Sequence, residues 1–154
     1  MFEIRTFSAD DTVRIGEKLG ALLREGDVVC LSGDLGTGKT AFTGGIARAL
    51  GIDSYVTSPT FTIVNEYKGR LPLYHFDVYR IADPEEMFEI GLEEYLGGNG
   101  VVVVEWAEII RDVLPCEYIS VEIRKDLASG VDVRVIAFDF IGHRYEGLER
   151  QLPL

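Results

Sequence analysis

Runs of apolar residues alternate with polar and glycine-rich stretches along the chain, and their spacing predicts several strands. Val28 to Leu31 and Val101 to Val104 are apolar at every position, which is typical of parallel strands covered on both faces. Tyr118 to Arg124 and Val131 to Phe140 alternate instead, and Ser129-Gly130 between them is a turn signal. We therefore expect two fully buried strands and a later pair of half-buried strands.

A third pair of strands is expected in the middle of the chain. Ser58-Pro59 breaks the preceding segment, and the β-rich runs Thr60 to Tyr67 and Leu71 to Tyr79 flank Lys68-Gly69-Arg70. This arrangement predicts an antiparallel hairpin.

Helical spacing and capping signals predict four helices between these strands. The first begins at the capping pair Ser8 and Asp11 and runs toward Gly26, and it is the first element expected in the chain. The others are Ala41 to Leu50, closed by Gly51; a helix opened by Asp83-Pro84-Glu85-Glu86 and running to about Ile90; and a short helix through Ile109 and Ile110 that ends before Pro115. The order of elements predicts an α/β fold, with a mixed central sheet flanked by helices.

Length and composition narrow the class of protein. A chain of 154 residues with 47% hydrophobic residues is expected to form one domain, covering 1–154. No apolar stretch approaches the roughly twenty residues of a membrane helix, and the N-terminus lacks the apolar block of a signal peptide, so a cytoplasmic protein is expected. Cys30 and Cys116 form no C-x-x-C pair and are interpreted as structural thiols. A net charge of -11 argues against direct binding of nucleic acid.

The strongest chemical signal is a phosphate-loop motif that lies between the first buried strand and the helix after it. Its residues are Gly33, Asp34, Leu35, Gly36, Thr37, Gly38, Lys39 and Thr40, which match G-x-x-x-x-G-K-S/T. The glycines allow successive N–H groups to converge on a phosphate at the helix N-terminus. Lys39 is expected to reach the phosphates and the Thr40 hydroxyl to bind Mg²⁺, with Ala41 as the next nucleotide-binding position. The alternative is a glycine-rich turn with an incidental lysine.

Two acidic residues are candidates for the chemistry of nucleotide hydrolysis. Glu105 ends the buried strand Val101 to Val104, where a nucleoside triphosphatase needs a carboxylate near its magnesium ion. In the expected strand Leu71 to Tyr79, alternation puts His75 and Asp77 on one face, and Asp77 can position the attacking water. The alternatives are a strand-end glutamate that meets solvent and a solvated aspartate on a half-exposed strand.

Other polar and aromatic residues have weaker claims to the site. Thr60 can sense a γ-phosphate, or simply begin a strand. Trp106 adjoins Glu105, but core packing is the better expectation for a lone tryptophan. Arg48 and Arg80 can stabilise transferred charge, although solvated arginines are commoner. For the adenine pocket the sequence offers only the start of the first helix, Ala9 to Thr12.

Together these segments resemble the TsaE (YjeE) family of bacterial ATPases. The resemblance spans Ser8 to about Arg134. The matching segments are Gly33 to Thr40, Ser58-Pro59-Thr60-Phe61-Thr62, His75-Phe76-Asp77-Val78-Tyr79-Arg80, Asp83-Pro84-Glu85-Glu86, Gly91-Leu92-Glu93-Glu94-Tyr95 and Val104-Glu105-Trp106. It implies Glu105 as a magnesium ligand, Asp77 and Thr60 as residues of catalysis or nucleotide sensing, and Trp106 as a neighbour of the site.

The resemblance also implies a function and partners. The family supports threonylcarbamoyladenosine modification of tRNA with ATP and Mg²⁺, and its ATPase activity alone is weak. It implies a complex with a threonylcarbamoyl transferase subunit (TsaD-like) and its non-catalytic paralogue (TsaB-like), in which ATP hydrolysis resets the transferase for repeated turnover. Contact with tRNA would then be indirect, and no membrane is implied.

Three other functions remain open from the sequence. A small-molecule kinase would need an acceptor site and usually an arginine-rich lid, which the sequence does not suggest. A non-hydrolytic module would use ATP only to set a conformation that partners recognise. A GTPase is disfavoured because the N-K-x-D guanine-reading motif is missing.

Overall fold

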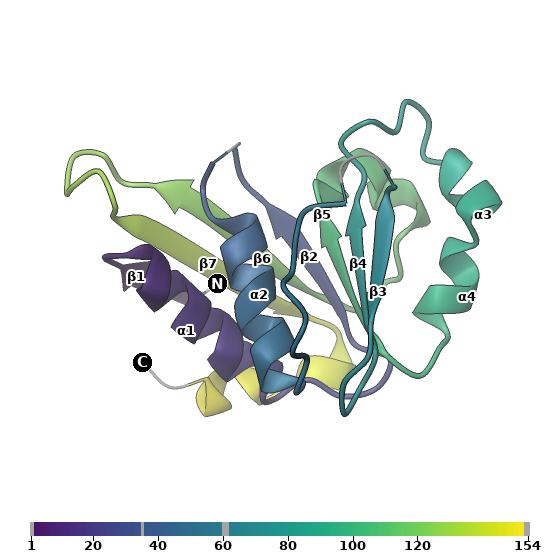
Figure 1. Cartoon of the computed structure of the whole chain (residues 1–154), viewed down its shortest axis with the longest axis horizontal. Coiled ribbons are helices and arrows are strands. Elements are labelled where there is room, and N and C mark those ends of the chain that lie inside the picture. Colours follow the sequence, from purple (N-terminus) through teal and green to yellow (C-terminus); the bar gives the residue numbers. More distant parts are fainter. Residues whose placement is uncertain (1, 35, 60–61, 153–154) are drawn as a thin grey trace.

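The computed structural model describes residues 2–34, 36–59 and 62–152 of the chain. Within these ranges, seven strands form one mixed sheet in the order β1-β7-β6-β2-β5-β4-β3 (Figure 1). The strands are β1 (Phe2–Thr6), β2 (Val28–Ser32), β3 (Val64–Tyr67), β4 (Leu73–Asp77), β5 (Val101–Glu105), β6 (Tyr118–Lys125) and β7 (Arg134–Ile141).

The sheet is parallel at its centre and antiparallel at its edges. Strand β2 pairs in parallel with β5 and with β6, and β5 pairs in parallel with β4. The edge pairs β1–β7, β6–β7 and β3–β4 are antiparallel. Because β2, β4 and β5 run in the same direction, their carboxyl ends lie at one edge of the sheet, where Asp77 of β4 stands beside Glu105 of β5.

Helices cover both faces of the central strands (Figure 1). One face carries α1 (Ala9–Gly20) and α2 (Lys39–Ala49), and the other carries α3 (Glu86–Ile90), α4 (Leu92–Leu96) and the 3-10 helix η1 (Ala107–Val113). Two further 3-10 turns, His143–Tyr145 and Leu148–Gln151, follow β7. None of the helices within the described ranges is long and apolar enough to cross a membrane.

The two helical layers enclose two apolar cores, one on each face of the sheet. Val29, Leu31, Val101 and Val103 point toward α1 and α2. The alternate residues Val28, Cys30, Val102 and Val104 point toward α3, α4 and η1, together with Phe76 and Met87. This double burial explains why β2 and β5 are apolar at consecutive positions.

Most of the expected elements are present, and the differences have identifiable causes. The hairpin is confirmed, with Asn65 opposite His75, but its first strand starts at Val64 because Ile63 has a φ of 70°. Residues Thr60 and Phe61 of the expected strand lie outside the described residues. The first helix ends at Gly20 rather than near Gly26. The expectation that a helix comes first was wrong, since β1 precedes it and pairs with β7.

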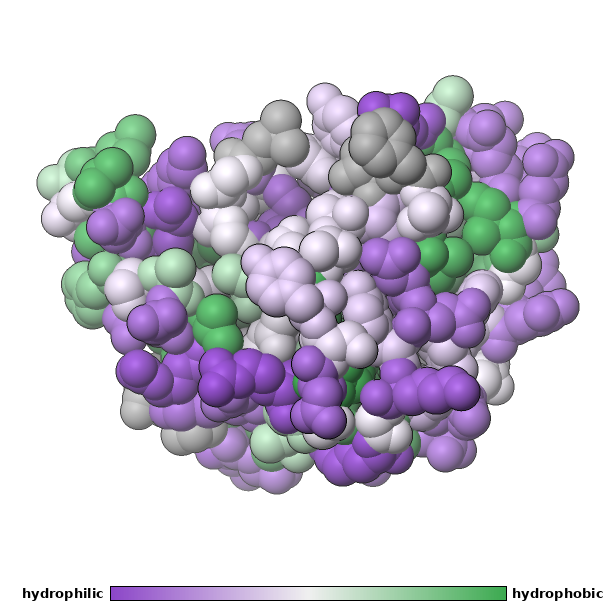
Figure 2. All heavy atoms as spheres, viewed as in Figure 1, coloured by the Kyte–Doolittle hydropathy of each residue, from purple (hydrophilic) through white to green (hydrophobic). Residues whose placement is uncertain are grey.

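The surface seen over α1 and α2 is mainly hydrophilic, with apolar side chains gathered in separate places (Figure 2). One such place is the end of the β6–β7 hairpin, where Leu127 and Val131 are 67% and 76% exposed.

Candidate functional site

The phosphate-loop motif forms the connection between β2 and α2. Gly33, Gly36 and Gly38 have φ values of 140°, 76° and 109°, a region that side chains disfavour. The conformational role expected of these glycines is therefore confirmed. The loop ends at Gly38, the N-cap of α2, so the first amides of the helix are directed into the loop.

Lys39 is the first residue of α2, and its side chain folds back along the loop. Its Nζ donates to the carbonyl oxygens of Gly33 at 2.6 Å and Asp34 at 3.0 Å. The ammonium also lies 4.2 Å from the centroid of the Trp106 ring, a cation–π distance. Burial lowers the pKa of Lys39, and the charges of Glu105 and other nearby carboxylates oppose that shift. The site thus combines one buried cation with several anionic groups.

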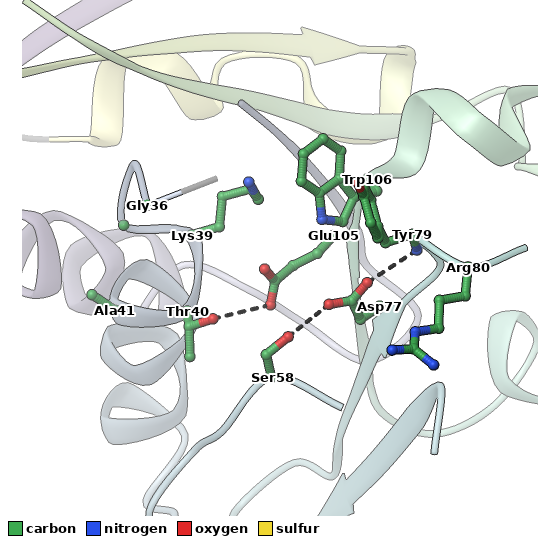
Figure 3. A pocket seen from close by; sticks show the side chains of 11 residues that line it. Gly36, Lys39, Thr40, Ala41, Ser58, Asp77, Tyr79, Arg80, Glu105 and Trp106 are labelled. Carbon is green, nitrogen blue, oxygen red and sulfur yellow. Dashed lines mark hydrogen bonds between the residues drawn. The ribbon is translucent and has the colours of Figure 1, made fainter. Parts of the chain in front are cut away.

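Thr40 and Glu105 face each other from α2 and the end of β5 (Figure 3). The Thr40 hydroxyl lies 3.5 Å from Oε2 of Glu105, and the Glu105 side chain is 3% exposed. Oε2 also contacts Nε2 of His75, which is fully buried in β4. Within the described ranges, no group of three or more His, Cys, Asp or Glu side chains is arranged to hold a metal ion. Thr40 and Glu105 thus present one hydroxyl and one carboxylate to the same corner of the site.

Asp77 ends β4 next to Glu105, and both of its carboxylate oxygens are engaged. Ser58 Oγ donates to Oδ2 at 2.6 Å, and the amide of Tyr79 donates to Oδ1 at 3.0 Å (Figure 3). Asp77 is 5% exposed, so the alternative of a solvated aspartate on a half-exposed strand was wrong. Both faces of β4 are covered, and the carboxylate is held by named donors.

These side chains surround one cavity of about 540 Å³ at the carboxyl ends of β4 and β5. Figure 3 shows them converging from the loop, from α2 and from the strand ends. The lining residues are Gly36, Gly38, Lys39, Thr40, Ala41, Ser58, Asp77, Tyr79, Arg80, Glu105 and Trp106. The structure therefore brings together Lys39, Thr40, Ala41, Asp77 and Glu105, which the sequence predicted as site residues.

Other residues predicted for the site either lie away from this cavity or fall outside the described residues. Asp34 lines a separate cavity behind the loop, on the side of Cys30. Thr37 is buried and donates from Oγ1 to the carbonyl of Asp34 at 3.0 Å. Leu35 and Thr60 lie outside the described residues. The segment Ala9 to Thr12, the suggested adenine pocket, borders a small cavity of about 70 Å³ beside Thr37 and Gly38, lined by Ala9 and Thr12.

Trp106 packs against the apolar core on the side of α3, α4 and η1, as expected, and it is also a wall of the site. It adopts a φ of 64°, its amide donates to the carbonyl of Leu31 at 3.0 Å, and its ring packs against Tyr79 with centroids 4.8 Å apart. Arg80 lines the same cavity. Arg48 does not, because it pairs with Glu17 of α1 at 3.1 Å.

Two contacts at the site were not expected from the sequence. Ser58 was interpreted only as part of a chain break, but its hydroxyl holds Asp77. Alternation along the strand predicts that His75 lies beside Asp77 on one face. In the structure, its ring contacts Glu105 of the neighbouring strand β5, across the β4–β5 register. That register depends on strand pairing, and strand order cannot be read from local sequence patterns.

Fold and loop together define an α/β protein with a phosphate-loop motif between its central strand and a helix. Residues 6–133 match the family model "Threonylcarbamoyl adenosine biosynthesis protein TsaE". The chain is 48% identical to the Bacillus subtilis tRNA threonylcarbamoyladenosine biosynthesis protein TsaE, over 96% of this chain and 91% of the relative. It is 50% identical to the Treponema pallidum protein of the same name, over 76% of this chain and 87% of the relative.

A solved structure agrees with these sequence matches. The crystal structure of Bacillus subtilis YdiB superposes with a TM-score of 0.84 at 43% identity, covering 98% of this chain and 93% of that one. The chain belongs to the TsaE family of threonylcarbamoyl adenosine biosynthesis proteins.

Proposed function

We propose that this protein is a Mg²⁺-dependent ATPase that supports threonylcarbamoylation of an adenosine in tRNA. The observation that carries the proposal is the single cavity in which the phosphate loop, Thr40, Glu105 and Asp77 meet. Family membership supplies the biosynthetic context. ATP would be the substrate, and the cytoplasm the compartment in which the reaction takes place.

The geometry of the loop supports phosphate binding. The positive φ values of Gly36 and Gly38 direct backbone amides inward, and α2 contributes the positive end of its dipole. Lys39 is anchored to carbonyl oxygens of the loop, and these are contacts that an anionic phosphate can replace. The residues Asp34 to Ala41 would therefore hold the phosphates, chiefly through backbone N–H groups and the Lys39 ammonium.

The donor set opposite the loop suits Mg²⁺. This ion prefers a few protein oxygen ligands, completed by water and substrate phosphate. The Thr40 hydroxyl and the Glu105 carboxylate are oxygen donors 3.5 Å apart at the loop, which fits this preference. When bound there, the ion would neutralise charge that develops on the phosphates.

Asp77 is the residue in this proposal that orients the attacking water. Its two hydrogen bonds, from Ser58 and from the amide of Tyr79, fix the plane of its carboxylate. Each oxygen retains acceptor capacity, so the carboxylate can still accept from a water in the cavity. Thr60 stays a predicted nucleotide sensor.

ATP turnover by variants tests the catalytic part of this proposal. Lys39→Ala and Glu105→Ala should lower turnover by at least about 10²-fold, because removing one stabilising group of this kind costs roughly that much. Lys68→Ala, at an exposed lysine in the β3–β4 turn, serves as a control and should keep the parent rate. Parent rates in both site variants would overturn the assignment.

A reconstituted modification assay tests the biological part. The transferase subunit, its paralogue, tRNA and threonylcarbamoyl-adenylate are mixed with and without this protein and ATP. We expect product beyond one turnover only when both are present. No effect with active partners would overturn the resetting role. Full modification with a hydrolysis-dead Glu105 variant would instead favour a module that binds ATP without hydrolysing it.

A further inference from the structure

One oxygen of Glu105 is shared between two elements. Oε2 accepts from the Thr40 hydroxyl of α2 and lies within hydrogen-bond distance of Nε2 of His75 in β4. The His75 side chain is 0% exposed and that of Glu105 is 3% exposed. The carboxylate is thus held from two sides in a place that bulk water scarcely reaches.

His75 is the donor in this contact. A carboxylate oxygen accepts, so we assign a hydrogen to Nε2 of the ring. Nδ1 is fully buried and has no hydrogen-bond partner within the described ranges. An unsatisfied buried polar atom costs about 1–3 kcal/mol, a cost that a leucine or valine at this strand position would avoid. Packing alone therefore does not explain a histidine here, whereas its contact with Glu105 does.

Glu105 also has a competing partner. The ammonium of Lys39 is close enough for the charge of Glu105 to act on it, yet Nζ donates hydrogen bonds to the loop carbonyls of Gly33 and Asp34. A carboxylate released from His75 could turn toward that ammonium and form a direct ion pair. Such a pair would remove both groups from the phosphate and metal positions.

We propose that His75 is a positioning residue that keeps the Glu105 carboxylate turned toward Thr40 and away from Lys39. The inference rests on the proposed Mg²⁺–nucleotide site and deepens it. Hydrogen-bond partners behind a metal ligand fix its orientation, and losing one typically costs about 10–100-fold in metal affinity or activity. The ring acts in this role as a hydrogen-bond donor, and the role requires no change in its protonation.

Three substitutions separate positioning from packing. His75→Leu fills the space without a donor, and His75→Asn keeps a polar group too short to reach Glu105. His75→Gln places an N–H near the position of Nε2. His143→Leu is the matched control, because this second histidine is 97% exposed and lies far along the chain in the turn after β7.

The readout is nucleotide affinity with and without the metal. Calorimetric titration with the non-hydrolysable ATP analogue AMPPNP is performed in Mg²⁺ and in EDTA, and thermal melts check folding. We expect Mg²⁺ to tighten binding by the parent. His75→Leu and His75→Asn should lose about 10–100-fold of this gain while keeping the parent affinity in EDTA. His75→Gln should recover most of the gain, and His143→Leu should match the parent.

The possible failures are distinguishable. A parent-like Mg²⁺ gain in both His75→Leu and His75→Asn would overturn the positioning role and leave the proposed site intact. A parent that gains nothing from Mg²⁺ would overturn the metal site itself, and the positioning role with it. An equal loss of affinity in Mg²⁺ and in EDTA would show that His75 merely supports the fold.

Discussion

At the scale of single residues, the site depends on backbone conformations that side chains normally avoid. Trp106 and Ile63 are the non-glycine residues with positive φ in the described part of the chain; Trp106 follows Glu105 directly, and Ile63 contacts Asp77. Each such conformation costs on the order of 1–3 kcal/mol and persists only where its surroundings enforce it. The amide of Trp106 is held by Leu31, and the carbonyl of Ile63 accepts from the amide of Asp77 at 2.8 Å. These two hydrogen bonds hold the strained backbone next to Glu105 and Asp77.

The two cysteines should react very differently with thiol reagents. Cys30 is buried, and its burial raises the pKa of its thiol to about 12, while Cys116 is exposed. The thiolate is the reactive form, so at pH 8 Cys30 is both protonated and inaccessible. We expect a maleimide to modify one thiol per chain in the folded protein, as counted by mass spectrometry, and two after denaturation.

A matched pair of substitutions checks that assignment. Cys116→Ser should abolish labelling of the folded protein, and Cys30→Ser should leave it unchanged. Rapid labelling of Cys30 in the Cys116→Ser variant would contradict the buried position of β2. It would also show that the covering layer of η1 opens readily.

The role of a site residue could be predicted from the sequence where a single short segment determines that role. The loop Gly33 to Thr40 and the strand-end Glu105 are such cases, because motif and position lie within a few residues. The roles of Ser58 and His75 could not be predicted this way. They depend on which strand lies beside which, and on the segment before β3, which brings Ser58 to Asp77 at the end of β4.

At the scale of elements, close packing of α1 against α2 positions the phosphate loop. Glycines at the contact allow the backbones to meet. A Cβ on Gly20 would lie 2.8 Å from Cβ of Ala49, and a Cβ on Gly45 would lie 2.8 Å from the amide nitrogen of Glu17 while overlapping the Val13 carbonyl. Because α2 begins at Lys39, any displacement of this helix would move the residues that are proposed to bind phosphate and metal.

Substitution by alanine at the neighbouring glycines Gly44 and Gly45 of α2 should therefore change the free energy of unfolding in opposite directions. Gly45→Ala introduces a clash with backbone atoms and should destabilise the protein by about 1–3 kcal/mol, the usual cost of overpacking. Gly44 has nothing within 4 Å of the added Cβ, so Gly44→Ala should stabilise it by about 0.5–1 kcal/mol through helix propensity. Urea unfolding measures both values. Equal effects of the two substitutions would contradict the α1–α2 contact.

The same scale shows where element prediction fails. The helix expected after Asp83 is present but begins at Glu86, and the turn before it is held by Asp83, which accepts from the amide of Glu85, and by Glu86, which accepts from the amides of Ala82 and Asp83. Its expected end at Ile90 is also confirmed, because Gly91 adopts a φ of 87° there, but the second short helix that follows, α4, was not expected. Strand β1 was missed because five residues at an edge carry little periodic signal, and its pairing with β7 is remote in sequence.

At the scale of the whole molecule, the charge of the chain limits what it can bind alone. With a net charge of -11, phosphate backbones are repelled except at the local field of the loop. Purified protein should therefore retain no tRNA in a filter-binding assay at about 0.15 M salt, with or without ATP, whereas a complex reconstituted with the proposed transferase partners should retain it. Micromolar affinity of the isolated protein for tRNA would contradict the indirect route proposed for it.

The thermal stability of the whole protein can also show whether ATP binds at the phosphate loop. A ligand that binds only the folded state stabilises it by about 2.7 kcal/mol at a concentration of 100 times its Kd. For a domain of this size, each kcal/mol raises Tm by roughly 2–4 °C, so saturating ATP with Mg²⁺ should raise Tm by about 5–11 °C. Lys39→Ala should remove most of this shift, because the loop loses its only buried cation among the residues described. A full Tm shift in Lys39→Ala would show that ATP binds at a different site. The alternative candidate would be the cavity of about 630 Å³ that also borders Thr40 and Ala41 and is lined by Gly44, Ile52 and Tyr55.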